Sequence, residues 1–246
     1  MGGHAVLVRE YFLRGFYPSG TATLSDAFSP SGALLKAMLV ASSEALTRII
    51  YDNGTVRGTS LADNNQGYGR IELDNSLTFL NATRDGLTLF VKGAADSSSE
   101  HYVEMSWLDA PHVYTFRTVA DPNLGPLRVV LAYTDVYLAS GASTPLANDL
   151  DIELTNATHT FYPLVTNQDG KYDRLNPLEM IILENPEPNS TYTVTVTAYS
   201  MTTAQSYALV ITGEVGGDSN SRSNGDVSSE YWTSSGNVIY MSVALC

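Results

Sequence analysis

The sequence predicts a mainly β protein: an antiparallel, jelly-roll-like β-sandwich preceded by a short helical segment. Two observations support this prediction. After about Leu77 the hydrophobic pattern has a period of two residues in many short runs, separated by turn sequences rich in Gly, Pro, Asn and Asp. Before that point the apolar residues recur at helical spacing. Many short strands without intervening helices favour a sandwich of antiparallel sheets.

Two helices are predicted in the first seventy residues. The first spans His4 to Arg14, where apolar residues follow helical spacing until Pro18 prevents its continuation. The second spans Phe28 to Ser43, with Ser29 as its expected N-cap and Pro30 as its first helical residue. Residues 51–69 are rich in Asn, Gly and Asp and are expected to form a surface loop.

The strands are predicted from alternation. In the run TYTVTVTAY, residues 191–199, Tyr192, Val194 and Val196 share one face and threonines occupy the other, as in a strand with one solvated side. Similar runs precede and follow it in the sequence: LTLFVKG, HYVEMSW, HVYTFRTV, PLRVVLAYT, DLDIELT, EMIILE and SYALVITG. The prediction is therefore a helical segment at 1–78, a sandwich at 79–213 and a flexible tail at 214–246, in which VIYMSVAL could form a stray strand.

Charge disfavours two classes of partner. The chain has 13 Lys and Arg against 26 Asp and Glu, a net charge of −13. This sign is opposite to that of proteins that bind nucleic acids or anionic membranes, so we expect neither partner. No apolar run is long enough to span a membrane, and charged residues interrupt the first segment, so the chain as written carries no export signal.

Cysteine content and Asn-x-Ser/Thr sequences are two features that can indicate the cellular compartment of a protein. The only cysteine is Cys246, which excludes an internal disulfide and a multi-cysteine zinc site. Asn-x-Ser/Thr sequences, which would suit an extracellular protein but also arise by chance, occur at Asn53, Asn81, Asn156 and Asn189.

A row of carboxylates is the candidate metal site. Period two places Asp149, Asp151 and Glu153 on one face of a predicted strand, while the leucines and the isoleucine between them face the core. Calcium prefers six to eight oxygen ligands, and Asp135, or Asp169 and Asp173, could complete the shell. The alternative is a solvated acidic face, since the spacing does not match an EF-hand loop.

Several ordered motifs resemble subtilisin-like serine proteases. Ala5 to Phe12, PSGALLKAMLVASS and NNQGYGRIELDNSL are similar to the end of the catalytic domain in that family. LRVVLAYTD, LANDLDIELTN and DRLNPLEMIILENP, followed by TYTVTVTAY, resemble the jelly-roll domain appended to one branch of it. The resemblance covers about residues 4–213 and implies a secreted endopeptidase, with structural calcium sites in the appended domain.

The catalytic motifs of that family are absent. Its aspartate lies in D-[ST]-G, its histidine in H-G-T-x-V-A-G and its serine in G-T-S-M-A-x-P, because the hydroxyl needs an imidazole base held by a carboxylate. None of the three motifs occurs here, and Ser60 in Gly58-Thr59-Ser60 lacks the following proline and comes after the predicted helices. We therefore expect a chain that begins after the nucleophile, through a truncated gene model, although a complete protein with a helical cap is the alternative.

Two functions follow from these observations. The first is the C-terminal fragment of a subtilisin-like serine endopeptidase, which reaches protein or peptide substrates through the missing catalytic domain and is inactive alone. Whether the chain counts as an enzyme is therefore uncertain. The second is a free-standing, calcium-stabilised sandwich that binds carbohydrate or protein, for which exposed aromatic residues could stack on sugars.

Overall fold

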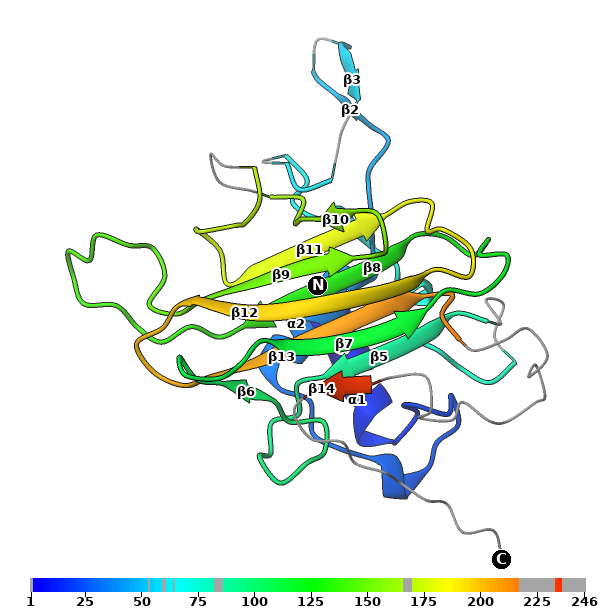
Figure 1. Ribbon diagram of the computed structural model, residues 1–246. Coiled ribbons are helices and arrows are strands. Elements are labelled where there is room, and N and C mark those ends of the chain that lie inside the picture. The colour runs from blue at the N-terminus through cyan, green and yellow to red at the C-terminus, as the bar shows by residue number, and fades with distance from the viewer. Residues whose placement is uncertain are drawn as a thin grey trace, which may run out of the picture.

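The computed structural model describes residues 2–52, 54–58, 61–63, 65–81, 86–165, 170–216 and 233–235. Within this part of the chain the protein is mainly β, which confirms the predicted fold class (Figure 1). Its helices are α1 (Gly2–Leu13), η1 (Leu24–Asp26), α2 (Gly32–Ala41) and η2 (Leu73–Asn75). Its strands are β1 (Ser43–Glu44), β2 (Arg48–Ile50), β3 (Val56–Gly58), β4 (Arg70–Ile71), β5 (Thr88–Lys92), β6 (Glu104–Met105), β7 (His112–Arg117), β8 (Leu127–Tyr133), β9 (Asp149–Thr155), β10 (Thr160–Phe161), β11 (Leu178–Leu183), β12 (Thr191–Ser200), β13 (Gln205–Gly213) and β14 (Thr233–Ser235).

Two antiparallel sheets form the sandwich. Sheet I has the strand order β10-β9-β12-β7-β14, and sheet II has the order β11-β8-β13-β5, with β6 paired to one end of β13. Strands that follow each other in the sequence frequently lie in different sheets, so the chain repeatedly crosses between the two layers (Figure 1). Each of the strand runs read from the sequence overlaps one of these strands.

The core between the sheets confirms the predicted alternation. On β12, Tyr192, Val194 and Val196 have no exposed surface, and they face inward while the threonines between them face outward. The opposite wall of this core comes from β8 and β13 of sheet II, including Leu131 and Leu209. Burial of these side chains supplies the main hydrophobic stabilisation of the sandwich.

Sheet II is buried on its second face as well. The outward-facing residues Val130 and Val210 pack against Leu34 and Met38 of α2, and α1 adds Phe12 to the same cluster. Figure 1 shows the helices behind sheet II, on the side away from sheet I. A strand buried on both faces should have no polar alternation. Accordingly, all seven residues of β8 are buried.

A glycine permits the close approach of α2 to sheet II. Gly93 has a φ of +131°, a conformation that side chains of L residues rarely adopt. A Cβ at this position would lie 2.7 Å from the Cβ of Ala208 and 3.1 Å from the Cβ of Leu34. Any larger residue would therefore push the helix away from the sheet.

The predicted start of α2 is wrong by two residues. The N-cap is Ser31, whose hydroxyl accepts a hydrogen bond from Leu34 N, and not Ser29. Pro30 forms a β-bridge with Ala94, and Ser29 O accepts from Ala95 N. These contacts hold residues 29–31 extended along the end of β5, so the helix begins after them.

Of the four short strands in this region, only β3 lies within the loop predicted at 51–69, and β1, β2 and β4 lie outside it. The structure pairs β2 with β3 and β1 with β4, although these segments have no sustained apolar alternation. The tail expected at 214–246 contributes β14, which pairs with β7 at the edge of sheet I. The stretch VIYMSVAL of that tail lies outside the described residues.

The helical layer can be tested with two leucines of opposite exposure. Leu34 has no exposed surface, whereas Leu24 is 86% exposed. We expect Leu34→Ala to lower the free energy of unfolding by about 2–5 kcal/mol, because it leaves a cavity between α2 and sheet II. Leu24→Ala should change it by less than about 0.5 kcal/mol. Denaturant unfolding measures both values, and equal small effects would contradict the burial of α2 against the sheet.

Candidate functional site

The predicted carboxylate row lies on β9 with the predicted orientation. Leu150, Ile152 and Leu154 are buried in the core between the sheets. Asp149 and Asp151 lie on the other face, yet they are only 6% and 4% exposed. They are not a solvated acidic face, because a later part of the chain covers them.

Residues 170–176, which we call the covering segment, form this cover. Arg174 of the segment donates from Nη1 to Asp151 Oδ1, and the same nitrogen lies 3.4 Å from Asp149 Oδ2. Tyr172 donates its hydroxyl hydrogen to Glu153. Each member of the predicted carboxylate row therefore contacts a side chain of the covering segment.

Aromatic rings hold the guanidinium in place. The Arg174 guanidinium carbon lies 3.5 Å from the ring centre of Tyr199 on β12 and 4.9 Å from that of Tyr172. A cation above an aromatic face is attracted by the electron density of the ring. The position of Arg174 thus depends on two carboxylates and two rings together.

Glu179 of β11 binds the covering segment, and it also accepts a hydrogen bond from a backbone amide of β9. Because β10 pairs only with the last two residues of β9, the amide of Ile152 has no strand partner on that side. Glu179 accepts from Ile152 N at 2.7 Å and from Asp173 N at 2.9 Å. One carboxylate therefore ties β9, β11 and the covering segment together.

The electrostatics of this cluster reflect burial. Burial raises the pKa of Asp151 to about 7, although Arg174 opposes the change. Burial also raises the pKa of Asp149, again against the effect of Arg174. For Glu179 burial raises the pKa to about 9, and the two backbone amides offset only part of the increase.

Asp135 stabilises the loop between β8 and β9 through hydrogen bonds to its backbone. Its carboxylate accepts from the backbone nitrogens of Val136, Ala147 and Asn148 at 2.8–3.0 Å. Asn148 is fully buried and continues this network, since its amide donates to Gln205 Oε1 at 2.9 Å. Asp135 thus closes a loop through the main chain.

The described residues do not form a calcium cage. Among them, no group of three or more Asp, Glu, His or Cys side chains is arranged to hold a metal ion. Arg174 occupies the oxygens of Asp149 and Asp151 that face the covering segment, and the amides occupy Asp135. Asp173 caps the next turn through Leu175 N, and Asp169 lies outside the described residues. These carboxylates are therefore engaged by other groups in this arrangement, and calcium stays a prediction.

No catalytic triad is formed by the residues that the structure describes. Three of the four histidines have identified contacts: His101 with Glu100 at 3.5 Å, His112 with the Tyr207 hydroxyl at 2.7 Å and His159 with the Thr158 hydroxyl at 2.7 Å. None of these contacts joins a histidine to a serine. Ser60, which the sequence marked as a poor candidate, lies outside the described residues.

Sequence reasoning missed the two residues that organise the cluster, Arg174 and Glu179. The available signal was the arginine in DRLNP, which follows the acidic strand motif in a chain with only 13 Lys and Arg. Nothing in the spacing indicated that residues 170–176 fold back over β9. The pairing is set by tertiary structure.

Comparisons with known proteins point to proteases. Three curated proteins of Dictyostelium discoideum, each named a serine protease/ABC transporter B family protein, match the chain. The protein named tagA is 25% identical over 217 residues, covering 84% of this chain and 11% of that protein, and tagB is 23% identical over 241 residues, covering 85% and 13%. The chain thus spans only a small part of the length of these relatives. No family model matches it.

No helix among the described residues is long and apolar enough to cross a membrane.

The similarity to the relatives extends over both parts of the chain. The matched region covers most of this chain in both relatives, so it includes strands of the sandwich as well as helical residues. The chain is therefore distantly related to proteins that carry serine protease names.

The role of Arg174 can be tested against an exposed arginine. Arg174→Met keeps the length of the side chain but leaves two buried carboxylates without their cation, so we expect the free energy of unfolding to fall by about 1–3 kcal/mol. Arg70, which is 59% exposed beside Glu44 and Glu72, is the control, and Arg70→Met should cost less than about 1 kcal/mol. Thermal and denaturant unfolding measure both. Equal costs would mean that Arg174 is not a structural counterion.

Proposed function

We propose that this chain is a non-catalytic segment of a subtilisin-like serine endopeptidase. Residues 1–78 would be the end of the catalytic domain and residues 79–213 an appended jelly roll. The observation that carries the proposal is the hydrophobic cluster shared by α1, α2 and sheet II, because it joins the helical segment to the sandwich in one packed layer. The serine protease names of the distant relatives support the same assignment.

The strand order supports the jelly-roll part of the proposal. A jelly roll contains eight strands in two four-stranded sheets connected as two Greek keys. Without β14 and β6, sheet I is β10-β9-β12-β7 and sheet II is β11-β8-β13-β5. In this order β7 to β12 and β8 to β13 are neighbours although four strands separate them in the sequence, as Greek-key connections require.

The exposed face of α1 supports a larger parent protein. Val6 and Leu7 are 60% and 58% exposed, whereas Val8 and Phe12 on the same helix are fully buried. Neighbouring exposed apolar side chains on a helix favour contact with a further part of the protein. In the proposed parent, the sheet of the catalytic domain covers this face of α1.

The chemistry of peptide-bond hydrolysis indicates which roles belong to the catalytic domain and which to the present segment. Peptide-bond hydrolysis through an acyl-enzyme needs a serine activated by an imidazole and a carboxylate. These groups would lie in the catalytic domain of the parent, which would be extracellular and would act on proteins or peptides. The present segment would stabilise that domain or position its substrate, and it would have no activity alone.

A free-standing binding module is the second candidate. Exposed aromatic side chains favour it, since Tyr137 is 95% exposed and Trp107 is 58% exposed. Such rings can stack on sugars. Binding to a glycan array that is lost in Tyr137→Ala would support this module over the protease segment.

The parent protein can be tested directly. Sequencing the full-length transcript should reveal an open reading frame that continues upstream of Met1 and encodes G-T-S-M-A-x-P. In addition, the 246-residue chain should show no cleavage of casein that is sensitive to a serine-protease inhibitor. An in-frame stop codon shortly before Met1, or inhibitor-sensitive turnover by the chain itself, would contradict the proposal.

Calcium is proposed as a structural ion of the same segment and has its own test. Added calcium should raise the melting temperature of the wild-type chain, and the increase should disappear in Asp149→Ala/Asp151→Ala. Magnesium at equal concentration is the control, because it accepts a flexible cage of protein oxygens less readily. If calcium leaves the wild-type melting temperature unchanged, Arg174 alone balances the carboxylates and the ion is rejected.

A further inference from the structure

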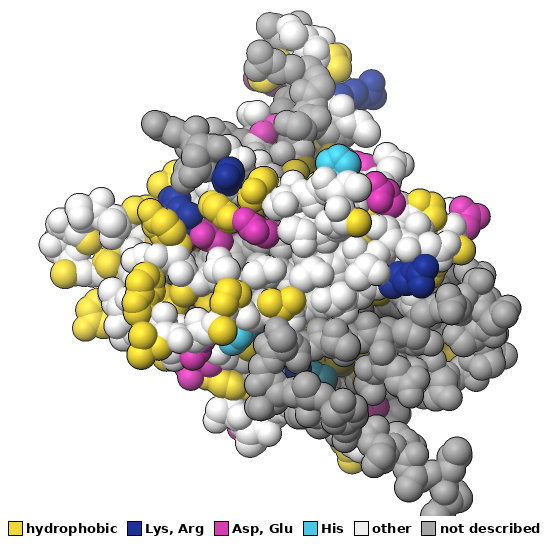
Figure 2. All heavy atoms as spheres, viewed as in Figure 1, with side chains coloured by type: hydrophobic (Ala, Val, Ile, Leu, Met, Phe, Trp, Pro, Cys, Tyr) yellow, Lys and Arg dark blue, Asp and Glu magenta, His cyan; other side chains and the backbone are white. Residues whose placement is uncertain are grey.

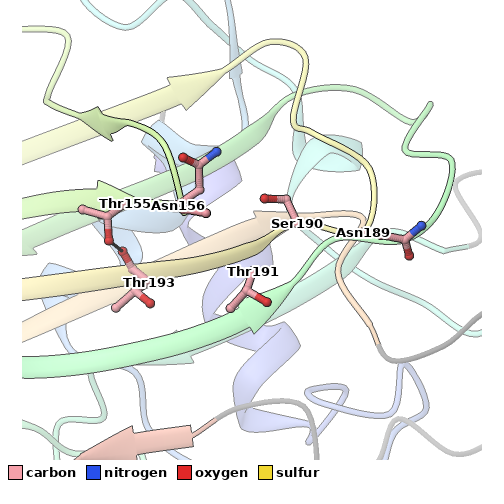
Figure 3. A pocket seen from close by; sticks show the side chains of 7 residues that line it. Thr155, Asn156, Asn189, Ser190, Thr191 and Thr193 are labelled. Atoms are coloured by element: carbon pink, nitrogen blue, oxygen red, sulfur yellow. Dashed lines mark hydrogen bonds between the residues drawn. The ribbon is translucent and has the colours of Figure 1, made fainter.

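Two Asn-x-Thr sequences lie on opposite sides of one groove. Asn156, Ala157 and Thr158 form the turn between β9 and β10, and Asn189, Ser190 and Thr191 lead into β12. Both turns line an open groove of about 460 Å³ on sheet I, whose floor includes Thr155 and Thr193 (Figure 3). The two sequences are 33 residues apart, and the pairing of β9 with β12 brings them together.

Asn156 is held in a turn that aligns its amide with the hydroxyl two residues later. Its Oδ1 accepts from Thr158 N at 3.0 Å, from Thr158 Oγ1 at 3.2 Å and from His159 N at 2.8 Å. Its Nδ2 donates to Glu187 Oε2 at 3.2 Å. An amide nitrogen carries two hydrogens, so one can be replaced while the other keeps the contact with Glu187.

Asn189 projects from a backbone that is fixed on both sides. Its φ is +53°, in the left-handed region that Asn tolerates better than most residues. Asn189 N donates to Val119 O at 3.0 Å, and Asn189 O accepts from Arg117 Nε at 3.0 Å. The residue is exposed, and Figure 3 shows its amide pointing away from the other labelled side chains.

Glu187 connects the two turns. Besides Asn156 Nδ2, its Oε2 lies 3.5 Å from Ser190 Oγ, the middle residue of the second sequence. The surrounding face of sheet I is polar and largely uncharged, because the outward residues of β12 from Thr191 to Thr197 are threonines, and Figure 2 shows it as a broad white area. A hydrated, uncharged polymer attached at its border would face hydroxyl groups and neither apolar nor strongly charged surface.

We propose that Asn156 and Asn189 are acceptors of N-linked glycans, anchored on the two sides of this groove. The proposal rests on the extracellular route of the proposed function. In the transfer, Nδ2 forms a bond to C1 of an oligosaccharide, and the bond from C1 to the diphosphate of a polyprenyl-diphosphate carrier breaks. Nδ2 loses one proton to a base of the transferase, and the lipid diphosphate leaves. This assigns the two asparagines to a modification typical of secreted surface loops.

The test uses a variant in which Asn53 and Asn81 are replaced by Gln, so that only the two sites of interest can react. A cleavable signal peptide directs this chain into the secretory pathway of an insect or mammalian cell. Peptide mapping after peptide N-glycosidase digestion in heavy-oxygen water should place one label at Asn156 and one at Asn189. Thr158→Val and Thr191→Val should each abolish one label, and Thr158→Ser and Thr191→Ser should retain it.

Both possible failures are interpretable. Secreted protein with both asparagines unmodified would overturn the proposal. If the variant is not secreted, it can be translated in the presence of microsomes instead. Each attached glycan slows the migration of the chain on a gel. Unchanged migration would count against the proposal. Since the signal peptide is supplied, a negative result rejects the acceptor sites and leaves the protease assignment to the transcript test.

Discussion

Sheet II is buried on both faces, and the rest of the described fold depends on that arrangement. Its inner face packs against sheet I, and its outer face packs against α1 and α2. A sheet whose strands are apolar on both sides cannot expose one face to water without a large loss of hydrophobic free energy. The helices are therefore part of the sandwich, and Gly93 provides the space that their approach requires. This constraint also links the helical segment to the sandwich in the proposed protease.

A second constraint is the balance of charge at the edge of sheet I. The chain has twice as many acidic as basic residues, and two of its carboxylates, Asp149 and Asp151, are almost completely buried. Buried carboxylates need a partner charge or a proton. Arg174 supplies the charge and contacts two tyrosine rings, while Glu179 of β11 links the covering segment to β9. Together these contacts fasten the covering segment to β9 near the edge of sheet I.

The sequence predicted the parts of the molecule that depend on local patterns. The strands of both sheets other than β10 and β14 were predicted, because patterns such as Tyr192, Val194 and Val196 are a direct consequence of strand geometry. Helix α1 was identified from its spacing, but the cap of α2 was misplaced because Pro30 forms an isolated bridge with Ala94, which follows β5 far along the chain. The orientation of Asp149 and Asp151 was also predicted, whereas their burial and their bond to Arg174 arise from a segment twenty residues later that no periodicity reveals.

Native-state hydrogen exchange tests most directly whether the helices and the sandwich are one cooperative unit. The account predicts that the amides of α2 and those of β8 and β13 exchange only through the same opening, with equal free energies and equal dependence on denaturant. Rapid exchange of α2 while β8 and β13 stay protected would contradict it, because the outer face of sheet II would then be stable without the helical layer.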